Sequence, residues 1–238
     1  MAEVKPYSAE GSKREQVEHM FDAISPKYDL LNRVFSLGTD QAWRRRVMRR
    51  VAEEPVDRLL DVATGTADLA MLAAKQVRHV DGADISEGML AHGREKVQRA
   101  GLAGRVVLHQ GDAAALPFTD GAFDAVTVAF GVRNFEDLQA GLRGMLRVLK
   151  PGGRLFVLEF SRPSWWMRPI FRLYFHGVMP LIGRLISKDS AAYTYLPASV
   201  DAFPEGRAFE TILAASGGRE VRSERLTGGI ATLYIARK

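Results

Sequence analysis

Short apolar runs alternate with amphipathic stretches along the middle of the chain. The runs predict strands over residues 57–63, 79–84, 105–110, 123–130 and 153–160. The stretches between them carry apolar residues three and four positions apart, which predicts helices over residues 66–77, 86–100 and 135–149. Because strands and helices alternate, we expect a mainly parallel sheet with helices on both faces.

Both ends of the chain extend this core. Ser12 is expected to cap a helix that ends at Pro26, and a second helix is expected over residues 40–52. A third, over residues 204–216, precedes two strand-like runs that the residues Thr-Gly-Gly join as a hairpin. The sequence therefore predicts an α/β fold of seven strands, the last antiparallel, preceded by N-terminal helices.

Length and composition narrow the class of protein. The 238 residues suit one α/β domain with additions, and a net charge of +5 does not by itself indicate nucleic acid binding. The absence of cysteine excludes disulfides, Cys-ligated zinc and thiol nucleophiles. The N-terminus lacks the apolar core of a signal peptide, and no run approaches the ~20 apolar residues of a membrane span. We expect a cytoplasmic protein.

Carboxylates follow the first three predicted strands, at Asp61, Asp84 and Asp112. Ligands of open parallel sheets bind beyond the carboxyl ends of the strands. There, Asp84 can accept hydrogen bonds from ribose hydroxyls and Asp112 from an adenine amino group, while Gly65 allows close approach of the backbone. Each acid alone is more typical of a helix cap, but three at successive strand ends favour a cofactor site. The predicted cofactor-binding residues are Asp61, Ala63, Gly65, Thr66, Asp84, Ile85, Asp112, Ala113 and Ala129.

The loop at residues 63–68, ATGTAD, indicates which cofactor is bound. A dinucleotide site uses the pattern Gly-x-Gly-x-x-Gly to hold a pyrophosphate at a helix N-terminus. This loop has one of those glycines and acidic residues on both sides, which a pyrophosphate would oppose. A zwitterionic sulfonium ligand tolerates them. The loop therefore favours S-adenosylmethionine (SAM) over NAD.

Four segments resemble the class I C-methyltransferases of ubiquinone and menaquinone biosynthesis. They are KYDLLNRVFSLGTDQAW (27–43), AFGVRNF (129–135), RVLKPGGRLFVLEFS (147–161) and YTYLPASV (193–200). The chain departs from the family pattern at Leu31, where a methionine is usual, at Asp40, often a histidine, at Ala67, usually the last loop glycine, and at Ala129, where relatives have a serine. No imidazole is available at position 40 to act as a base.

The resemblance implies the Rossmann-like fold of class I SAM-dependent methyltransferases, with an N-terminal helical lid. It also implies methylation of a ring carbon beside a quinol hydroxyl, without a metal. It divides the chain into a tail and lid (1–55), a SAM-binding core (56–160), a helical insertion facing substrate and membrane (161–203) and a C-terminal helix and hairpin (204–238). Details such as DVATGTAD favour demethylmenaquinol as the substrate. The ubiquinone precursor 2-polyprenyl-6-methoxy-1,4-benzoquinol is the alternative.

The candidate catalytic residues are Arg133, Asn134, Tyr28 and His176. Arg133 and Asn134 follow the fourth strand and are expected to orient the quinol and stabilise its oxyanion, although Asn134 can equally cap a helix. Tyr28 is expected to close over the cofactor from the lid, or to be a core tyrosine. His176 is the best titrating base of its segment, although a histidine among aromatics is more often simply packed. Tyr193 and Tyr195 are further polar groups.

Residues 161–188 combine aromatic and basic side chains and contain no acidic residue. This pattern suits peripheral contact with anionic lipid at the inner face of a membrane, where polyprenyl quinols reside. A lid or a homodimer helix is the alternative. The five arginines within residues 44–50 are expected to form a solvated helix face rather than a lipid contact.

Three rival functions remain. A methyltransferase acting on a sterol, phospholipid or soluble phenol shares the fold, but the segments at 27–43 and 147–161 weigh against it. A noncatalytic nucleic-acid or cofactor-binding protein lacks support, since no basic and aromatic RNA module is apparent and the strand-end acids would repel phosphate. An NAD-dependent reductase is disfavoured by the single glycine of the loop.

Overall fold

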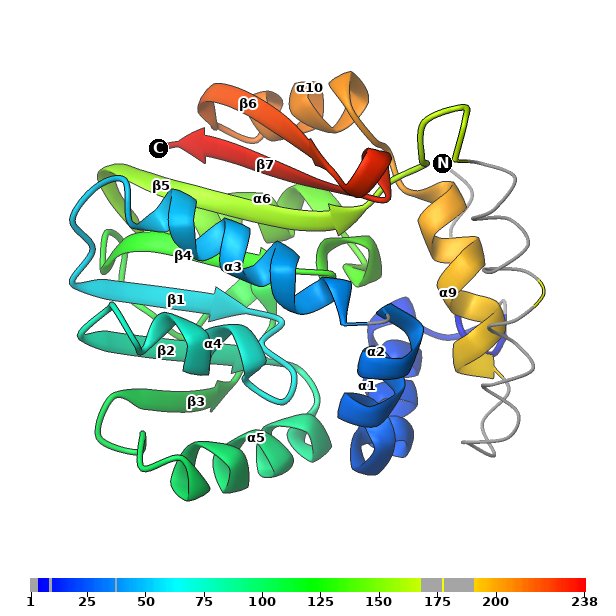
Figure 1. Ribbon diagram of the computed structural model, residues 1–238, viewed down its shortest axis with the longest axis horizontal. Helices are drawn as coiled ribbons and strands as arrows, with labels where there is room; N and C mark the ends of the chain where they lie inside the picture. Colours follow the sequence, from blue (N-terminus) through cyan, green and yellow to red (C-terminus); the bar gives the residue numbers. More distant parts are fainter. Residues whose placement is uncertain (1–3, 9, 37, 168–176, 178–190) are drawn as a thin grey trace.

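Seven strands form one sheet in the order β3-β2-β1-β4-β5-β7-β6, and helices cover both faces (Figure 1). The computed structural model describes residues 4–8, 10–36, 38–167, 177 and 191–238. The strands are β1 (Arg58–Val62), β2 (His79–Asp84), β3 (Val106–Gln110), β4 (Phe123–Ala129), β5 (Leu149–Phe160), β6 (Arg219–Leu226) and β7 (Ala231–Arg237). Only β7 runs against its neighbours, pairing antiparallel with both β5 and β6. The predicted fold class is confirmed.

The described helices pack on the sheet or lie over its carboxyl edge. They are α1 (Lys13–Ile24), α2 (Tyr28–Ser36), α3 (Thr39–Val51), α4 (Asp68–Ala73), α5 (Glu87–Arg99), α6 (Leu138–Val148), α9 (Ala191–Ala202) and α10 (Arg207–Ala215). Short 3-10 turns lie at η1 (Ser25–Lys27), η2 (Ala113–Ala115), η3 (Val132–Asn134) and η5 (Thr227–Gly229).

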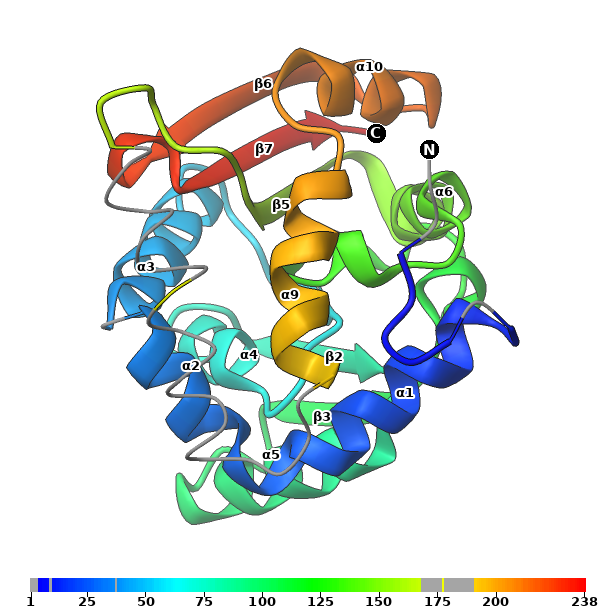
Figure 2. The same ribbon diagram turned by 90° about the vertical axis from the view of Figure 1, so that its right-hand side faces the viewer.

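Alternation along the strands divides the core into two layers. Leu59 and Phe156 face α3, α4 and α5, whereas Leu60 and Val157 face α6 and α10. Strands buried on both faces read as continuous apolar runs, which is why the sequence predicted them well. Since α3 packs against the sheet, only α1, η1 and α2 of the N-terminal segment lie over the carboxyl edge, together with α9 (Figure 2).

Helix α1 ends at Ile24, close to the end predicted at Pro26, but α2 was not predicted from the sequence. Pro26 lies in the first turn of η1, where its missing N–H costs nothing, and the chain continues directly into α2. The helix predicted from Thr66 begins only at Asp68. Gly65 and Ala67 have φ angles of 55° and 67°, which hold the preceding loop in a left-handed conformation.

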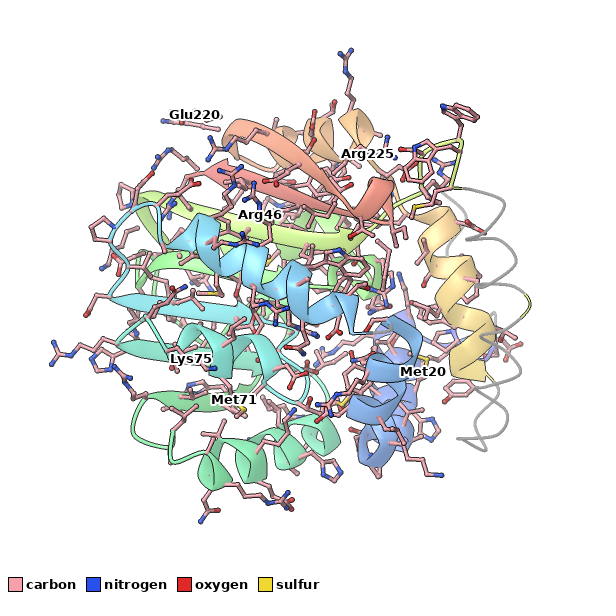
Figure 3. The ribbon with its side chains drawn as sticks, in the orientation of Figure 1. Met20, Arg46, Met71, Lys75, Glu220 and Arg225 are labelled. Carbon is pink, nitrogen blue, oxygen red and sulfur yellow. The ribbon has the colours of Figure 1, made fainter. Side chains whose placement is uncertain are left out.

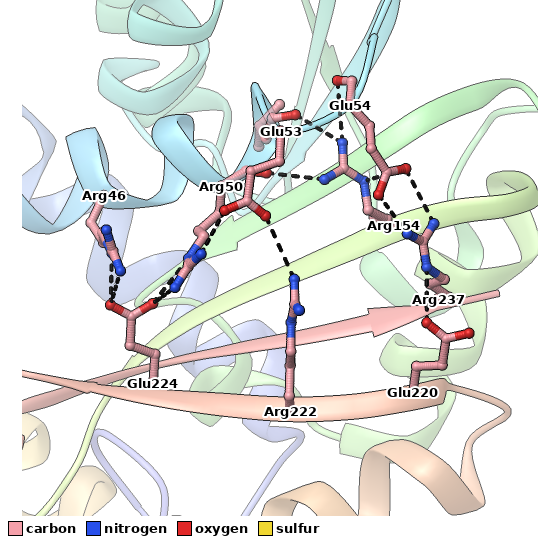
Figure 4. Close-up of polar contacts among 10 residues, drawn as sticks. Arg46, Arg50, Glu53, Glu54, Arg154, Glu220, Arg222, Glu224 and Arg237 are labelled. Carbon is pink, nitrogen blue, oxygen red and sulfur yellow. Dashed lines mark hydrogen bonds and ion pairs between the residues drawn. The ribbon is translucent and has the colours of Figure 1, made fainter.

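The arginines at 44–50 are not simply a solvated face. Arg46 and Arg50 of α3 both pair with Glu224 of β6, at 2.5 and 2.9 Å, within an ion-pair network that also joins β5 and β7 (Figure 4). Arg44 is buried against Asp40. The expectation fits only Arg45 and Arg49, which are exposed.

Candidate functional site

A cavity opens at the carboxyl ends of β1, β2 and β4, with α1 as its roof. The cavity has a volume of about 150 Å³, and the space that includes its open mouth is about 920 Å³. Seven of the nine predicted cofactor residues line it: Ala63, Gly65, Asp84, Ile85, Asp112, Ala113 and Ala129. Their contact with a cofactor stays a prediction, but topology brings them to one place.

Asp84 is the carboxylate best placed for a ligand. Its Oδ2 accepts a hydrogen bond from the Gly65 N–H at 2.8 Å and its Oδ1 accepts one from the Ser86 N–H at 3.0 Å. Burial raises the pKa of Asp84 to about 6, although both backbone bonds oppose the rise. Each carboxylate oxygen has a second lone pair, so Asp84 can still accept from two ribose hydroxyls.

Asp112 acts as a helix cap and also reaches the cavity. Its Oδ1 accepts from the Ala114 N–H at 2.9 Å, and its Oδ2 lies 3.3 Å from Nε of Arg14 on α1. The cap that the sequence suggested is confirmed, and the contact of Asp112 with a cofactor stays a prediction. Arg14, Val17 and Phe21 of α1 also line the cavity. The sequence indicated the apolar stripe of α1 but not the surface it covers.

Asp61 and Thr66, the other two predicted cofactor residues, do not line the cavity. Their contact with a cofactor stays a prediction. Asp61 is 2% exposed, and its carboxylate accepts from the hydroxyls of Thr64 at 2.8 Å and Thr127 at 2.7 Å. Asp61 therefore braces the loop against β4. The Thr66 hydroxyl donates to Asp29 of α2 at 2.5 Å.

Close backbone contacts shape the loop. A β-carbon added to Gly131 would lie 2.5 Å from the Ala63 β-carbon. The loop after β1 can therefore approach the end of β4 only because position 131 has no side chain. Ala63 and Phe130 have φ angles of 51° and 60°, which are uncommon for residues other than glycine. Such backbone strain is typical of ligand sites.

The lid is fastened to this loop by charged groups. Lys96 Nζ of α5 lies 2.6 Å from Asp29 of α2 and 2.5 Å from Asp68 at the start of α4. Asp22 of α1 accepts from the Ser86 hydroxyl at 2.6 Å and from the Gly88 N–H at 3.0 Å. The roof of the cavity is therefore fixed to the cofactor loop and to the start of α5.

Only some of the predicted catalytic residues line the cavity. Tyr28 and Asn134 line the cavity, and burial raises the pKa of the Tyr28 phenol, which keeps it protonated. Asp137, not Asn134, caps α6. Arg133 does not line the cavity: its Nη1 lies 2.9 Å from Oε1 of the fully buried Glu159. His176 lies outside the described residues, and so does the side chain of Tyr193.

The matched family decides the class of the protein. Residues 9–238 match the ubiE/COQ5 methyltransferase family. The chain belongs to this family. It is therefore a SAM-dependent methyltransferase, and SAM is its cofactor.

Relatives within the family are similar over their full length. A demethylmenaquinone methyltransferase of Bacteroides fragilis is 47% identical over 238 residues, covering 99% of this chain and 97% of the relative. One from Thermus thermophilus is 48% identical over 219 residues, covering 91% and 98%. The crystal structure of a SAM-dependent methyltransferase from Thermotoga maritima, a possible histamine N-methyltransferase, has a TM-score of 0.65 at 17% identity and covers 93% of this chain and 99% of that one. The last likeness supports the fold alone.

The cavity residues of this methyltransferase fit SAM. Acidic groups at the ends of β2 and β3 suit the ribose and the adenine, and the single glycine of the loop leaves no cradle for a pyrophosphate. Bound SAM supplies an electrophilic methyl group. The protein's own residues then have to bring a nucleophilic carbon to the end of β4, where Ala129 and Asn134 meet the cavity.

Proposed function

We propose that the protein methylates a ring carbon of a polyprenyl quinol, and that its substrate is demethylmenaquinol. The observation that carries this proposal is 47% identity along the whole chain to a demethylmenaquinone methyltransferase. The site supports it, because the polar groups of Asn134 and Tyr28 line the same cavity as the apolar side chains of Val17, Phe21 and Phe130. An aromatic diol suits such a mixed surface.

Ionisation of the quinol is the step in which the protein has to help. A phenol with a pKa near 10 is ionised in about one part in a thousand at pH 7, which corresponds to roughly 4 kcal/mol. The quinol hydroxyl loses a proton to water, the ring carbon gains the methyl group as the sulfur–methyl bond breaks, and the same carbon then releases its own proton. Asn134, which lines the cavity just after β4, orients the quinol, and holding the carbon in line contributes roughly 7–11 kcal/mol.

An assay of methyl transfer tests the proposal. The purified protein is incubated with SAM labelled in its methyl group and with either demethylmenaquinol or 2-polyprenyl-6-methoxy-1,4-benzoquinol. We expect labelled menaquinol as the main product. Label only in the benzoquinol product would favour the ubiquinone pathway, and no label in either quinol would refute quinol methylation.

We also propose that the protein contacts the membrane surface near Trp165 and Trp166, which are 80% and 55% exposed. Such large exposed aromatic side chains suit a lipid interface. No described helix is long and apolar enough to cross a membrane. Arg162 pairs with Glu205 at 2.7 Å. Among the described residues, the proposed lipid contact therefore rests on the two tryptophans.

Sedimentation with anionic phospholipid vesicles tests this contact. Replacing both tryptophans by alanine should reduce the bound fraction, whereas Val107→Ser, at an exposed apolar site on β3, should not. Equal sedimentation of the tryptophan variant would refute the contact. A change in mass by light scattering instead would assign the segment to a homodimer.

A further inference from the structure

Buried polar atoms without a partner gather beside the cofactor cavity. Among the described side chains they are Arg44 Nε, Arg133 Nε, Asn134 Oδ1 and the Tyr195 hydroxyl. Leaving one such atom unpaired costs about 1–3 kcal/mol, and folded proteins rarely do so without a reason. Arg133 and Asn134 belong to η3, which α9 contacts, and Tyr195 belongs to α9.

Tyr195 is buried against α1. It is 4% exposed and packs with Val17, Met20 and Ile24 of α1, in a cluster that also includes Tyr28 and Ile85. Figure 2 shows α9 crossing the carboxyl edge of the sheet beside α1, and Figure 3 labels Met20 of this cluster. Val17, Tyr28 and Ile85 line the cavity, so Tyr195 belongs to the cluster of side chains that builds this wall.

The charges around Tyr195 determine what its hydroxyl can do. Burial raises the pKa of Tyr195 to about 12, and Arg133 lowers it less than burial raises it, while Glu159 adds to the rise. The hydroxyl is therefore protonated at every physiological pH. Because a free quinol ionises near pH 10, a quinolate oxygen would not take the Tyr195 proton. Tyr195 can donate a hydrogen bond but cannot act as a base.

We propose that Tyr195 is a catalytic residue whose hydroxyl donates a hydrogen bond to the quinol oxygen as that oxygen becomes negatively charged. The proposal rests on quinol methylation as the function. A quinol brings an acceptor oxygen for Tyr195 and a hydroxyl hydrogen for Asn134 Oδ1, so its two functional groups match two of the unpartnered atoms. Tyr195 keeps its own proton throughout, and the proton of the quinol hydroxyl leaves to water.

The Tyr195→Phe variant separates this role from a structural one. Loss of one donor to a developing oxyanion should lower kcat by roughly 10²–10³-fold. The half-maximum of kcat should move to higher pH, because the quinolate loses a stabilising contact. The Tm and the affinity for SAM should not fall, since the hydroxyl has no protein partner to lose.

Tyr234→Phe is the matched control. Tyr234 is 1% exposed in the core, and its hydroxyl accepts from the Gly206 N–H at 2.7 Å. Removing that hydroxyl should lower the Tm and leave kcat and its pH profile unchanged. The two tyrosines therefore predict opposite results for stability and for turnover.

Two outcomes would overturn the role of Tyr195. One is a Tyr195→Phe variant with wild-type kcat and an unshifted pH profile. The other is loss of activity together with lower Tm and weaker SAM binding, which would make the residue structural. A wild-type protein that methylates neither quinol would instead refute the proposed function, and this role with it.

Discussion

Asp84 should make the affinity for SAM depend on pH. Its carboxylate already accepts two backbone hydrogen bonds and has to be ionised to accept further ones from ribose at full strength. Burial raises its pKa to about 6, so the group is neutral below that pH and charged above it. The affinity should therefore be complete at pH 8 and decline as the pH falls through about 6.

The size of the effect follows from this pKa. At pH 5 roughly one Asp84 in eleven is ionised, so the Kd of SAM should rise about tenfold between pH 8 and pH 5. Asp84→Asn loses a charge-assisted hydrogen bond, about 1.5–3 kcal/mol. That loss corresponds to a Kd roughly 10- to 150-fold higher at pH 8. Its affinity should no longer change over this pH range.

Isothermal titration of SAM at several pH values measures both effects. Asp61→Asn is the control, because burial also raises the pKa of Asp61 to about 6 but its carboxylate faces Thr64 and Thr127 rather than the cavity. Threonine hydroxyls can donate or accept, so the amide should be tolerated there. A wild-type Kd that stays constant from pH 5 to pH 8, or a pH dependence that persists in Asp84→Asn, would refute the reasoning.

Two further predictions concern the loop and the lid. Gly65→Val should abolish SAM binding in a titration, because φ is 55° and the new side chain would extend from a β-carbon only 3.8 Å from Tyr28 Cε1. Ala67→Gly, where φ is 67°, should leave the affinity unchanged, and tight binding by Gly65→Val would contradict the role of the loop. Lys96→Met removes the ion pairs to Asp29 and Asp68 and should speed SAM dissociation in stopped-flow measurements. An unchanged off-rate would show that these ion pairs do not retain the cofactor.

Much of the fold was readable from local pattern. The β4 and β5 strands are buried on both faces, so continuous apolar runs marked them, and the hairpin-like turn before β7 gave its direction. The predicted cofactor site at the strand ends could be located for a related reason. Acids at successive ends of parallel strands have to meet at one edge, and Asp84 and Asp112 do line one cavity.

The sequence alone predicted the α/β fold class, a ligand cavity at the carboxyl edge of the sheet and the family. Only the tertiary structure decided which polar groups face a ligand. Asp61 turns inward to two threonines, and Arg46 reaches Glu224 far along the chain. The Tyr195 hydroxyl has no hydrogen-bond partner in the protein, although it lies near the charges of Arg133 and Glu159. The period of a helix or strand encodes which face is buried, but the partner of a buried polar atom depends on packing between distant segments.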